Sequence, residues 1–273
     1  MKNNYYRNIL GTAAVTAALS GATAIAGTEM TPAPPMEMPS EDVISGTLSL
    51  DFNSHFISYG FDVWQDGVDN SDYGFYPSAE LAFALPYDFT LTTGVWVEIN
   101  GKAPGAITAQ ETDIWVGLSK SFGAFSAGIT YQEWFYGGDS EDVIDLSFGY
   151  DTFLSPSLTI HNRVGEGASG GDTGTIFVFG VSYDVEAGPV TFSFPASVAI
   201  FATDEFHGAG LDSGYGYSSV GVHATLPLTP YIGEGFGEWD FHTGVDFYFT
   251  EDDVIGNENN YPFNVNFGIG CSF

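Results

Sequence analysis

Basic residues are scarce in this chain. Its 273 residues include five Lys and Arg against 35 Asp and Glu, which gives a formal net charge of −30. Two of the basic side chains, Lys2 and Arg7, lie in the first 26 residues, which contain no acid. A surface of this sign repels nucleic acid and attracts cations, so no nucleic-acid partner is expected.

Cysteine and long apolar runs are also nearly absent. Because Cys271 is the single cysteine, a disulfide within the chain is excluded. Beyond the first 26 residues, no stretch approaches the roughly 20 apolar residues that a membrane helix requires. The chain also lacks a phosphate loop, a cysteine zinc site and the EF-hand spacing, so neither a cofactor nor a metal site is predicted.

The N-terminal segment predicts export. Residues 1–26 begin with Lys2 and Arg7, continue through a run of small apolar residues and end in Ala24-Ile25-Ala26, the pattern of a secretory signal peptide. Residues 27–44 contain TPAPPMEMPSED, which is rich in proline and acid and indicates an extended periplasmic tail. The folded domain is therefore expected to span residues 45–273.

That domain consists of alternating segments. In the last one, PFNVNFGIGCSF, apolar and polar or glycine residues alternate strictly, so one face of the strand is apolar. Each segment has about ten to fourteen residues, longer than a typical soluble strand and close to a tilted membrane strand. Twelve such segments are predicted: 45–57, 74–86, 88–101, 110–121, 124–136, 142–151, 156–165, 174–185, 189–202, 215–226, 238–250 and 262–273.

The connections between these segments alternate in length. Short ones, such as Tyr87 and Phe122-Gly123, follow even-numbered segments, and longer ones, such as 203–214, often follow odd-numbered segments. This pattern predicts an all-β fold, a transmembrane antiparallel up-and-down β-barrel of about 12 strands. A soluble secreted β-sandwich is the alternative, because its strands also alternate.

Two parts of the sequence resemble known families. The final strand, closed by Phe273, resembles that of bacterial outer-membrane β-barrels. This resemblance implies an outer-membrane location in a Gram-negative cell, contact with outer-membrane lipid and lipopolysaccharide, self-association as an option, and Phe273 as the signal for the barrel assembly machinery. Residues 47–67, TLSLDFNSHFISYGFDVWQDG, with the following Tyr73-Gly74-Phe75, resemble small putative porins of the TorF type, which implies transport of small solutes.

The inward face of the predicted barrel is acidic. Its expected solute-contacting residues are Asp51, His55, Trp96, Glu98, Glu111, Asp113, Trp115, Trp134, Asp240, His242 and Asp246. An acidic lumen favours passive diffusion of small polar or cationic solutes. The same groups could instead form a hydrated plug, which would make the protein a closed structural or adhesive barrel without transport.

Three tryptophans, Trp96, Trp115 and Trp134, lie on the polar face of their segments. Indoles next to carboxylates suit sugars or organic cations, although the rings could simply fill the barrel. If Phe122-Gly123 is a two-residue hairpin loop, Glu111 should lie opposite Trp134.

A third hypothesis is an outer-membrane hydrolase. It would require a nucleophile beside a base that a third group orients. The candidates are His161 and Asn162 with Ser147, and Asp204 with His207. The alternation directs His161 toward the lumen, away from lipid, so we predict no enzymatic activity and name no catalytic residue.

Overall fold

The computed structural model describes residues 43–65, 73–100, 108–136, 138–165, 171–233, 237–260 and 262–273. The predicted signal peptide, residues 1–26, lies outside the described residues, as does the predicted tail except for its last two residues.

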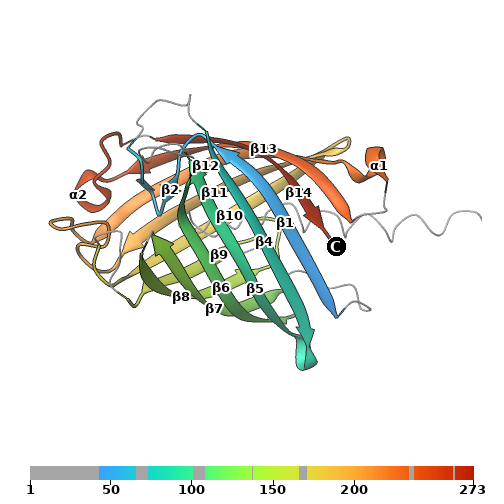
Figure 1. Cartoon of the computed structure of the whole chain (residues 1–273), viewed down its shortest axis with the longest axis horizontal. Helices are drawn as coiled ribbons and strands as arrows, with labels where there is room; N and C mark the ends of the chain where they lie inside the picture. Colours follow the sequence, from blue (N-terminus) through green and yellow to red (C-terminus); the bar gives the residue numbers. More distant parts are fainter. Residues whose placement is uncertain are drawn as a thin grey trace, which may run out of the picture.

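The domain is one closed antiparallel barrel (Figure 1). Each strand pairs with its neighbours along the chain, and β1 closes the barrel against β14, in the order β1-β14-β13-β12-β11-β10-β9-β8-β7-β6-β5-β4. Its twelve strands are β1 (Ile44–Asn53), β4 (Gly74–Leu85), β5 (Phe89–Asn100), β6 (Thr108–Phe122), β7 (Phe125–Tyr136), β8 (Asp139–Tyr150), β9 (Ser157–Arg163), β10 (Gly174–Ala187), β11 (Val190–Phe201), β12 (Gly214–Pro227), β13 (Glu238–Thr250) and β14 (Phe263–Ser272). The predicted number of strands is confirmed, and two stacked sheets are excluded.

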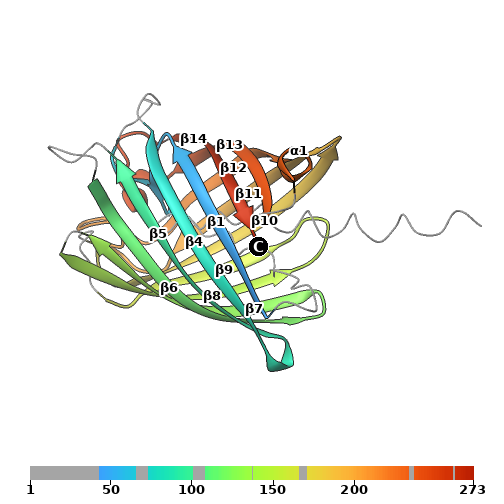
Figure 2. The same ribbon diagram turned by 45° about the vertical axis from the view of Figure 1, so that its right-hand side comes forward.

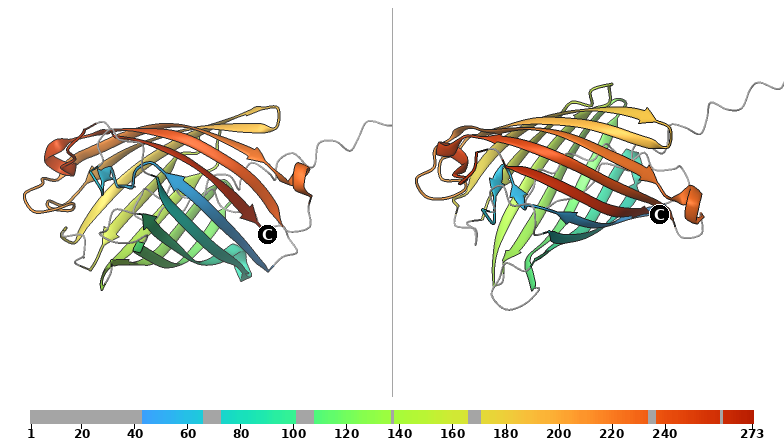
Figure 3. Two further views of the ribbon diagram at one scale, coloured as in Figure 1. Left: turned by 45° about the horizontal axis from the view of Figure 1, so that its top comes forward. Right: turned by 90° about the horizontal axis from the view of Figure 1, so that it is seen from above.

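Helical elements are few and short. A 3-10 turn, η1 (Pro86–Asp88), joins β4 to β5, and α1 (Thr229–Ile232) lies between β12 and β13 at the same end of the barrel. The helix α2 (Asp252–Ile255) lies at the opposite end, which we call the loop end; the end with η1 and α1 is the turn end (Figure 3). No helix among the described residues is long and apolar enough to cross a membrane.

The barrel wall is apolar outside and polar inside. On β1, Ser49, Asp51 and Asn53 are buried, whereas Leu48 and Phe52 between them are exposed. Exposed large apolar side chains recur on every strand except β9, as this side-chain alternation requires. Lipid is the medium that can cover so broad an apolar surface, and the outer face has the composition of a membrane-spanning barrel.

The seam between β1 and β14 lies beside the C-terminus (Figure 2). The pairing extends to the last residue, because the backbone N–H groups of Gly46 and Phe273 donate to each other's carbonyl oxygens at 2.8 and 3.0 Å. The Phe273 ring covers Gly46: a Cβ atom at this glycine would lie 2.5 Å from Cζ of the phenylalanine. Only glycine leaves room for the ring there.

A short hairpin from the first loop lies inside the barrel. Strands β2 (Ile57–Ser58) and β3 (Phe61–Asp62) pair with each other beyond the end of β1, and β2 is seen within the loop end in Figures 1 and 3. We call residues 54–65 the lumen hairpin. Its side chains Phe56, Ile57 and Tyr59 are almost completely buried.

The turn of the lumen hairpin depends on Tyr59 and Gly60. Both have positive φ, 46° and 82°, as a type I′ turn requires. Gly60 also lies close to β12, three strands away from β1 around the barrel, since a Cβ atom there would lie 2.4 Å from Cδ1 of Tyr217. The hairpin therefore reaches across the lumen and fits closely at its tip.

Two other loops complete this inner layer. Asn257, which follows α2, donates from Nδ2 to the Gly60 carbonyl at 2.7 Å and accepts from the Asp62 amide at 2.8 Å. In the loop between β11 and β12, the His207 ring stacks on Phe61 with 5.2 Å between ring centroids. The loop end is thus filled by packed side chains from three loops.

Two local predictions were wrong. The first strand was expected to continue to residue 57, but β1 ends at Asn53, so His55 belongs to the lumen hairpin rather than to the barrel wall. The turn between β6 and β7 consists of Gly123 and Ala124, not Phe122 and Gly123, because the positive φ of Gly123, 67°, suits the first central position of a type II′ turn.

The displaced turn changes the register by two residues. Asp113, not Glu111, lies opposite Trp134. Because the shift is even, every side chain keeps its predicted face.

Candidate functional site

A row of alternating indoles and carboxylates crosses four neighbouring strands at the loop end. Trp96 on β5 pairs with Asp113 on β6, which pairs with Trp134 on β7, which pairs with Glu141 on β8. All four side chains point inward and are at most 1% exposed. We call these four residues the indole–carboxylate row.

Two further carboxylates lie next to this row. Glu98 and Glu111 are paired in the ladder between β5 and β6, and both are buried. The Glu98 carboxylate accepts hydrogen bonds from Asn100 Nδ2 and, at 2.6 Å, from Nε1 of Trp64 in the lumen hairpin. The structure therefore brings together Trp96, Trp134, Glu98, Glu111 and Asp113, as the sequence predicted.

Asp113 has little compensation for its burial. Apart from the adjacent carboxyl group of Glu111, its carboxyl group has no hydrogen-bond partner among the described residues, although its side chain is fully buried. A buried carboxylate in this state is costly unless a proton or a cation is close to it. A positive charge at the centre of the row would therefore be stabilised by the Asp113 carboxylate.

One guanidinium group stabilises the end of the row. Arg163 Nε on β9 lies 3.0 Å from Glu141 Oε2, and its Nη1 donates to the Phe206 carbonyl at 2.7 Å. The guanidinium carbon also lies 4.0 Å from the centre of the Phe206 ring, within cation–π distance. Arg163 thereby ties the β11–β12 loop to the acidic wall.

A hydrogen-bonded chain connects the lumen hairpin to the same wall. The Tyr59 hydroxyl lies 2.6 Å from Nδ1 of His161, and that nitrogen lies 2.7 Å from Oδ1 of Asp145. Asp145 accepts from Gln132 Nε2 at 2.6 Å, and Gln132 accepts from Trp134 Nε1 at 3.2 Å. The Tyr59 ring also stacks on Trp134 and packs at a tilt against His161, so the hairpin and the row form one packed unit.

Another group of predicted residues lies on the far side of the lumen. Strand β13 is separated from β7 by five strands in each direction around the barrel. There, His242 lies between two carboxylates, with Nε2 at 2.5 Å from Asp51 Oδ1 and Nδ1 at 2.8 Å from Asp240 Oδ1. Asp246 pairs with His223 at 2.9 Å. The predicted lumen residues thus form two separate groups.

Two predicted residues lie outside both groups. Trp115 covers Gly94, and its Nε1 donates to Glu80 Oε2 at 2.7 Å, which places it nearer the turn end than the row. His55 is buried in the lumen hairpin, where its Nε2 lies 4.0 Å from Asp62 Oδ2.

The sequence prediction missed several site residues: Phe56, Tyr59, Trp64, Glu141 and Phe206. Glu141 lies one residue before the segment 142–151 that the sequence predicts as a strand. A signal for the hairpin does exist, because the apolar positions of ISYGFD flank a Tyr-Gly pair that suits a tight turn.

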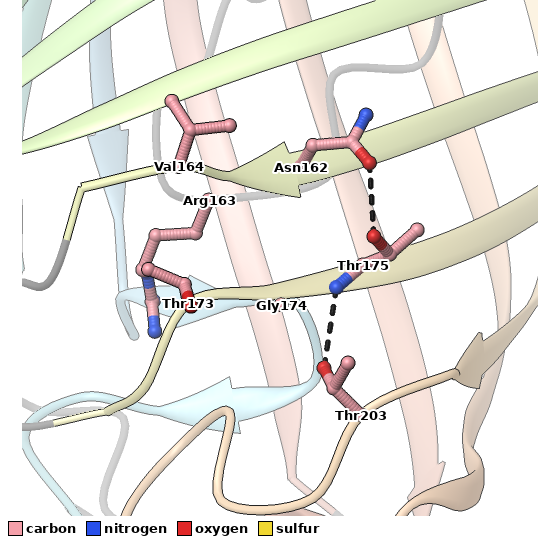
Figure 4. Close-up of a pocket in the computed structure, with 7 residues that line it drawn as sticks. All are labelled: Asn162, Arg163, Val164, Thr173, Gly174, Thr175 and Thr203. Carbon is pink, nitrogen blue, oxygen red and sulfur yellow. Dashed lines mark hydrogen bonds between the residues drawn. The ribbon is translucent and has the colours of Figure 1, made fainter.

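The residues considered for hydrolysis have separate partners. Ser147 on β8 pairs with Thr159 on β9, whereas His161 pairs with Asp145. Asn162 occupies the opposite face of β9 from the buried His161, and at the loop end it lines a pocket of about 370 Å³ (Figure 4). There its Oδ1 accepts from Thr175 Oγ1 at 2.9 Å, and the Thr175 amide donates to Thr203 Oγ1 at 3.2 Å.

The pair Asp204 and His207 is also separated by its partners. Asp204 Oδ1 accepts from the Ser213 amide at 2.8 Å, whereas His207 Nε2 lies 3.2 Å from the Tyr59 carbonyl. Among the described residues, no group of three or more His, Cys, Asp or Glu side chains is arranged to hold a metal ion.

His207 is the titratable group that links two of the loops inside the loop end. Burial, followed by the nearby positive charge of Arg163, lowers the pKa of His207 to about 3. The ring is therefore neutral at pH 7, and its Nε2–H donates to the Tyr59 carbonyl.

This lowered pKa predicts acid sensitivity. Between pH 6.5 and 3 the unfolded chain binds a proton at His207 and the folded chain does not, so stability should fall as the pH falls, by at most about 1.4 kcal/mol per pH unit from this group. The midpoint of urea unfolding, measured across this range, tests the prediction. His207→Gln keeps an N–H donor without titrating and should flatten the slope; an unchanged slope would contradict it.

Comparison with known proteins identifies the fold. No protein-family model and no curated protein matches the sequence. An outer membrane channel from Pseudomonas putida F1 is similar over 87% of this chain and 100% of its own, with 10% identity and a TM-score of 0.53. The Salmonella typhi outer membrane phospholipase dimer with bound calcium matches over 88% and 96%, with 10% identity and a TM-score of 0.46. OmpF from Salmonella typhi, in complex with daunomycin, matches over 84% and 97%, with 10% identity and a TM-score of 0.36.

The likeness to the Pseudomonas structure concerns the fold. It agrees with the closed barrel and its apolar outer wall, which define this chain as an outer-membrane β-barrel in structural class. The twelve-stranded barrel fits an outer-membrane location.

Proposed function

We propose that the protein is an outer-membrane channel for passive diffusion of small polar or cationic solutes, narrowed by the lumen hairpin. The observation that carries this proposal is the acidic wall around Asp113, which faces the lumen and attracts positive charge. Toward the turn end, small residues such as Ser119, Gly128 and Thr130 occupy the inward positions, where they take up less space than the indoles of the row. The Pseudomonas protein of similar fold is described as a channel, which supports the same role.

The proposal includes the finer expectations from sequence. Resemblance to TorF-type small porins supports a small-solute channel, and the apolar wall supports contact with lipid and lipopolysaccharide. Phe273 as an assembly signal and self-association remain predictions. We propose no enzymatic role, because His161 is engaged by Tyr59 and Asp145.

Planar bilayers test the channel. Purified protein should give small conductance steps whose reversal potential in a KCl gradient shows a preference for cations. Replacing Glu98→Gln, Glu111→Gln and Asp113→Asn together should reduce the preference for cations several-fold, because it removes three carboxyl groups from the acidic wall.

The control changes two exposed acids at the turn end, Asp184→Asn and Glu186→Gln, which should leave most of the preference intact. If neither the wild type nor a variant without the hairpin conducts, the channel proposal fails. That outcome would support the second candidate, a closed structural or adhesive barrel, which the dense packing of Phe56 and Tyr59 favours.

A further inference from the structure

The lumen hairpin places aromatic side chains directly on the indole–carboxylate row. Phe56 packs on Trp96 with 5.5 Å between ring centroids, and Tyr59 stacks on Trp134 at 6.4 Å with the rings 22° apart. Trp64 donates its indole N–H to Glu98 at 2.6 Å. Each contact combines an aromatic ring or an N–H donor with a group of the wall, as a bound solute would.

The hairpin supplies rings and a donor, but no cation. The row and its neighbours Glu98 and Glu111 bring four carboxyl groups together, and Arg163 pairs with one of them, Glu141. Asp113 lies between Trp96 and Trp134 in the ladder and lacks a partner other than Glu111. A positively charged group held between two indoles beside a carboxylate gains both cation–π and ionic attraction.

We propose that the indole–carboxylate row is a binding site for aromatic cations, the arylalkylammonium class, and that the lumen hairpin occupies it as an internal ligand. This inference rests on the proposed channel function and names the solute class of the same site. The ring of the solute replaces Phe56 or Tyr59 against an indole, and its ammonium group reaches Asp113. Binding therefore requires the hairpin to leave the row.

The hairpin combines buried aromatic contacts with a strained tip. Its tip depends on two positive-φ residues, Tyr59 and Gly60, and a tyrosine in this conformation costs of order 1 kcal/mol or more. Its contacts with the barrel wall and the inner loops include single hydrogen bonds, such as those from Tyr59 to His161 and from Asn257 to Gly60. A solute that binds the same residues shifts the equilibrium between the docked and the undocked hairpin. The size of the shift depends on how much more tightly the solute binds when the hairpin is undocked.

Tryptamine is a suitable probe, because it joins an indole to an ammonium group. Binding to the detergent-solubilised full chain is measured by titration calorimetry. Indole-3-propionate has the same ring with a negative charge, and hexylamine has the ammonium group without a ring. We expect tryptamine to bind at least about tenfold more tightly than either analogue, since each analogue lacks one of the two attractions.

The Gly60→Val variant tests the internal ligand. A side chain at Gly60 would overlap Tyr217 and would have to adopt φ near +82°, so the hairpin should undock. Tryptamine affinity should rise about tenfold, because the state with the undocked hairpin, to which tryptamine binds, is no longer rare. Adding Asp113→Asn to this variant should remove most of the gain.

A milder substitution tests the same competition if the Gly60→Val variant does not fold. Trp64→Phe keeps an aromatic ring but removes the donor to Glu98, and should raise tryptamine affinity roughly threefold by the same competition. The matched control is Trp239→Phe on β13, away from the row, which should leave affinity unchanged.

Equal binding of tryptamine and indole-3-propionate, or no gain in either hairpin variant, would overturn the inference. The channel proposal is judged separately by KCl conductance. Cation-selective conductance without tryptamine binding refutes the solute class alone, whereas tryptamine binding without conductance refutes transport and leaves the site.

Discussion

Removing the lumen hairpin should raise single-channel conductance several-fold. In this variant residues 55–64 are replaced by a short Gly-Ser linker that joins Ser54 to Gln65. The hairpin holds Phe56, Ile57 and Tyr59 in the lumen, and twelve strands enclose enough space for water once these side chains are gone. Conductance in planar bilayers, compared at equal salt with the wild type, measures the effect.

The matched control changes the other end of the barrel. Replacing α1 by Gly-Ser removes the exposed residues Tyr231 and Ile232, which lie outside the lumen, and should leave conductance unchanged. Unfolding midpoints of both variants show whether the barrel remains intact. An intact hairpin-less barrel that conducts no better than the wild type would show that other segments close the lumen.

Replacing Arg163 by Met should lower the free energy of unfolding by about 3–5 kcal/mol, because it leaves Glu141 charged and buried without its partner. The guanidinium and the carboxylate are each at most 4% exposed, so water cannot take the partner's place. The Phe206 carbonyl also loses its donor. Urea unfolding in lipid or detergent, followed by tryptophan fluorescence, measures the loss.

A paired variant separates charge from geometry in this prediction. Arg163→Lys keeps the positive charge but lacks the planar guanidinium group, so its free energy of unfolding should lie between those of Arg163→Met and the wild type. Arg163→Met combined with Glu141→Gln removes the unpaired charge and should also be more stable than Arg163→Met alone. A loss below about 1 kcal/mol in Arg163→Met would mean that the ion pair is dispensable.

The barrel could be predicted because side chains alternate between its two faces along every strand. A strand between lipid and water must alternate, so segments such as 238–250, which coincides with β13, could be located from hydropathy alone. The inward direction of Trp96, Glu98, Glu111 and Asp113 followed from the same parity. An error of two residues in the β6–β7 register left those directions unchanged, which is why the acidic wall could be predicted despite a wrong turn.

The contents of the loop end were not predictable in the same way. Residues of the lumen hairpin contact partners far away in the sequence, such as Tyr59 with His161 and Asp62 with Asn257. Such contacts depend on how a closed barrel places loops over its own opening, and no local period encodes them. Glu141 was missed for a smaller reason: strand ends are less well defined than strand centres, and β8 begins at Asp139.

The seam between β1 and β14 makes closure depend on the two strands that are farthest apart in the chain. Until Phe273 pairs with Gly46, β1 and β14 each have an edge of unpaired backbone N–H and C=O groups. Loop closure over this separation is slow, and a half-built cylinder offers its edges to any neighbouring copy. Closure of the barrel therefore requires the edges of β1 and β14 to stay apart from those of other copies until the two strands pair.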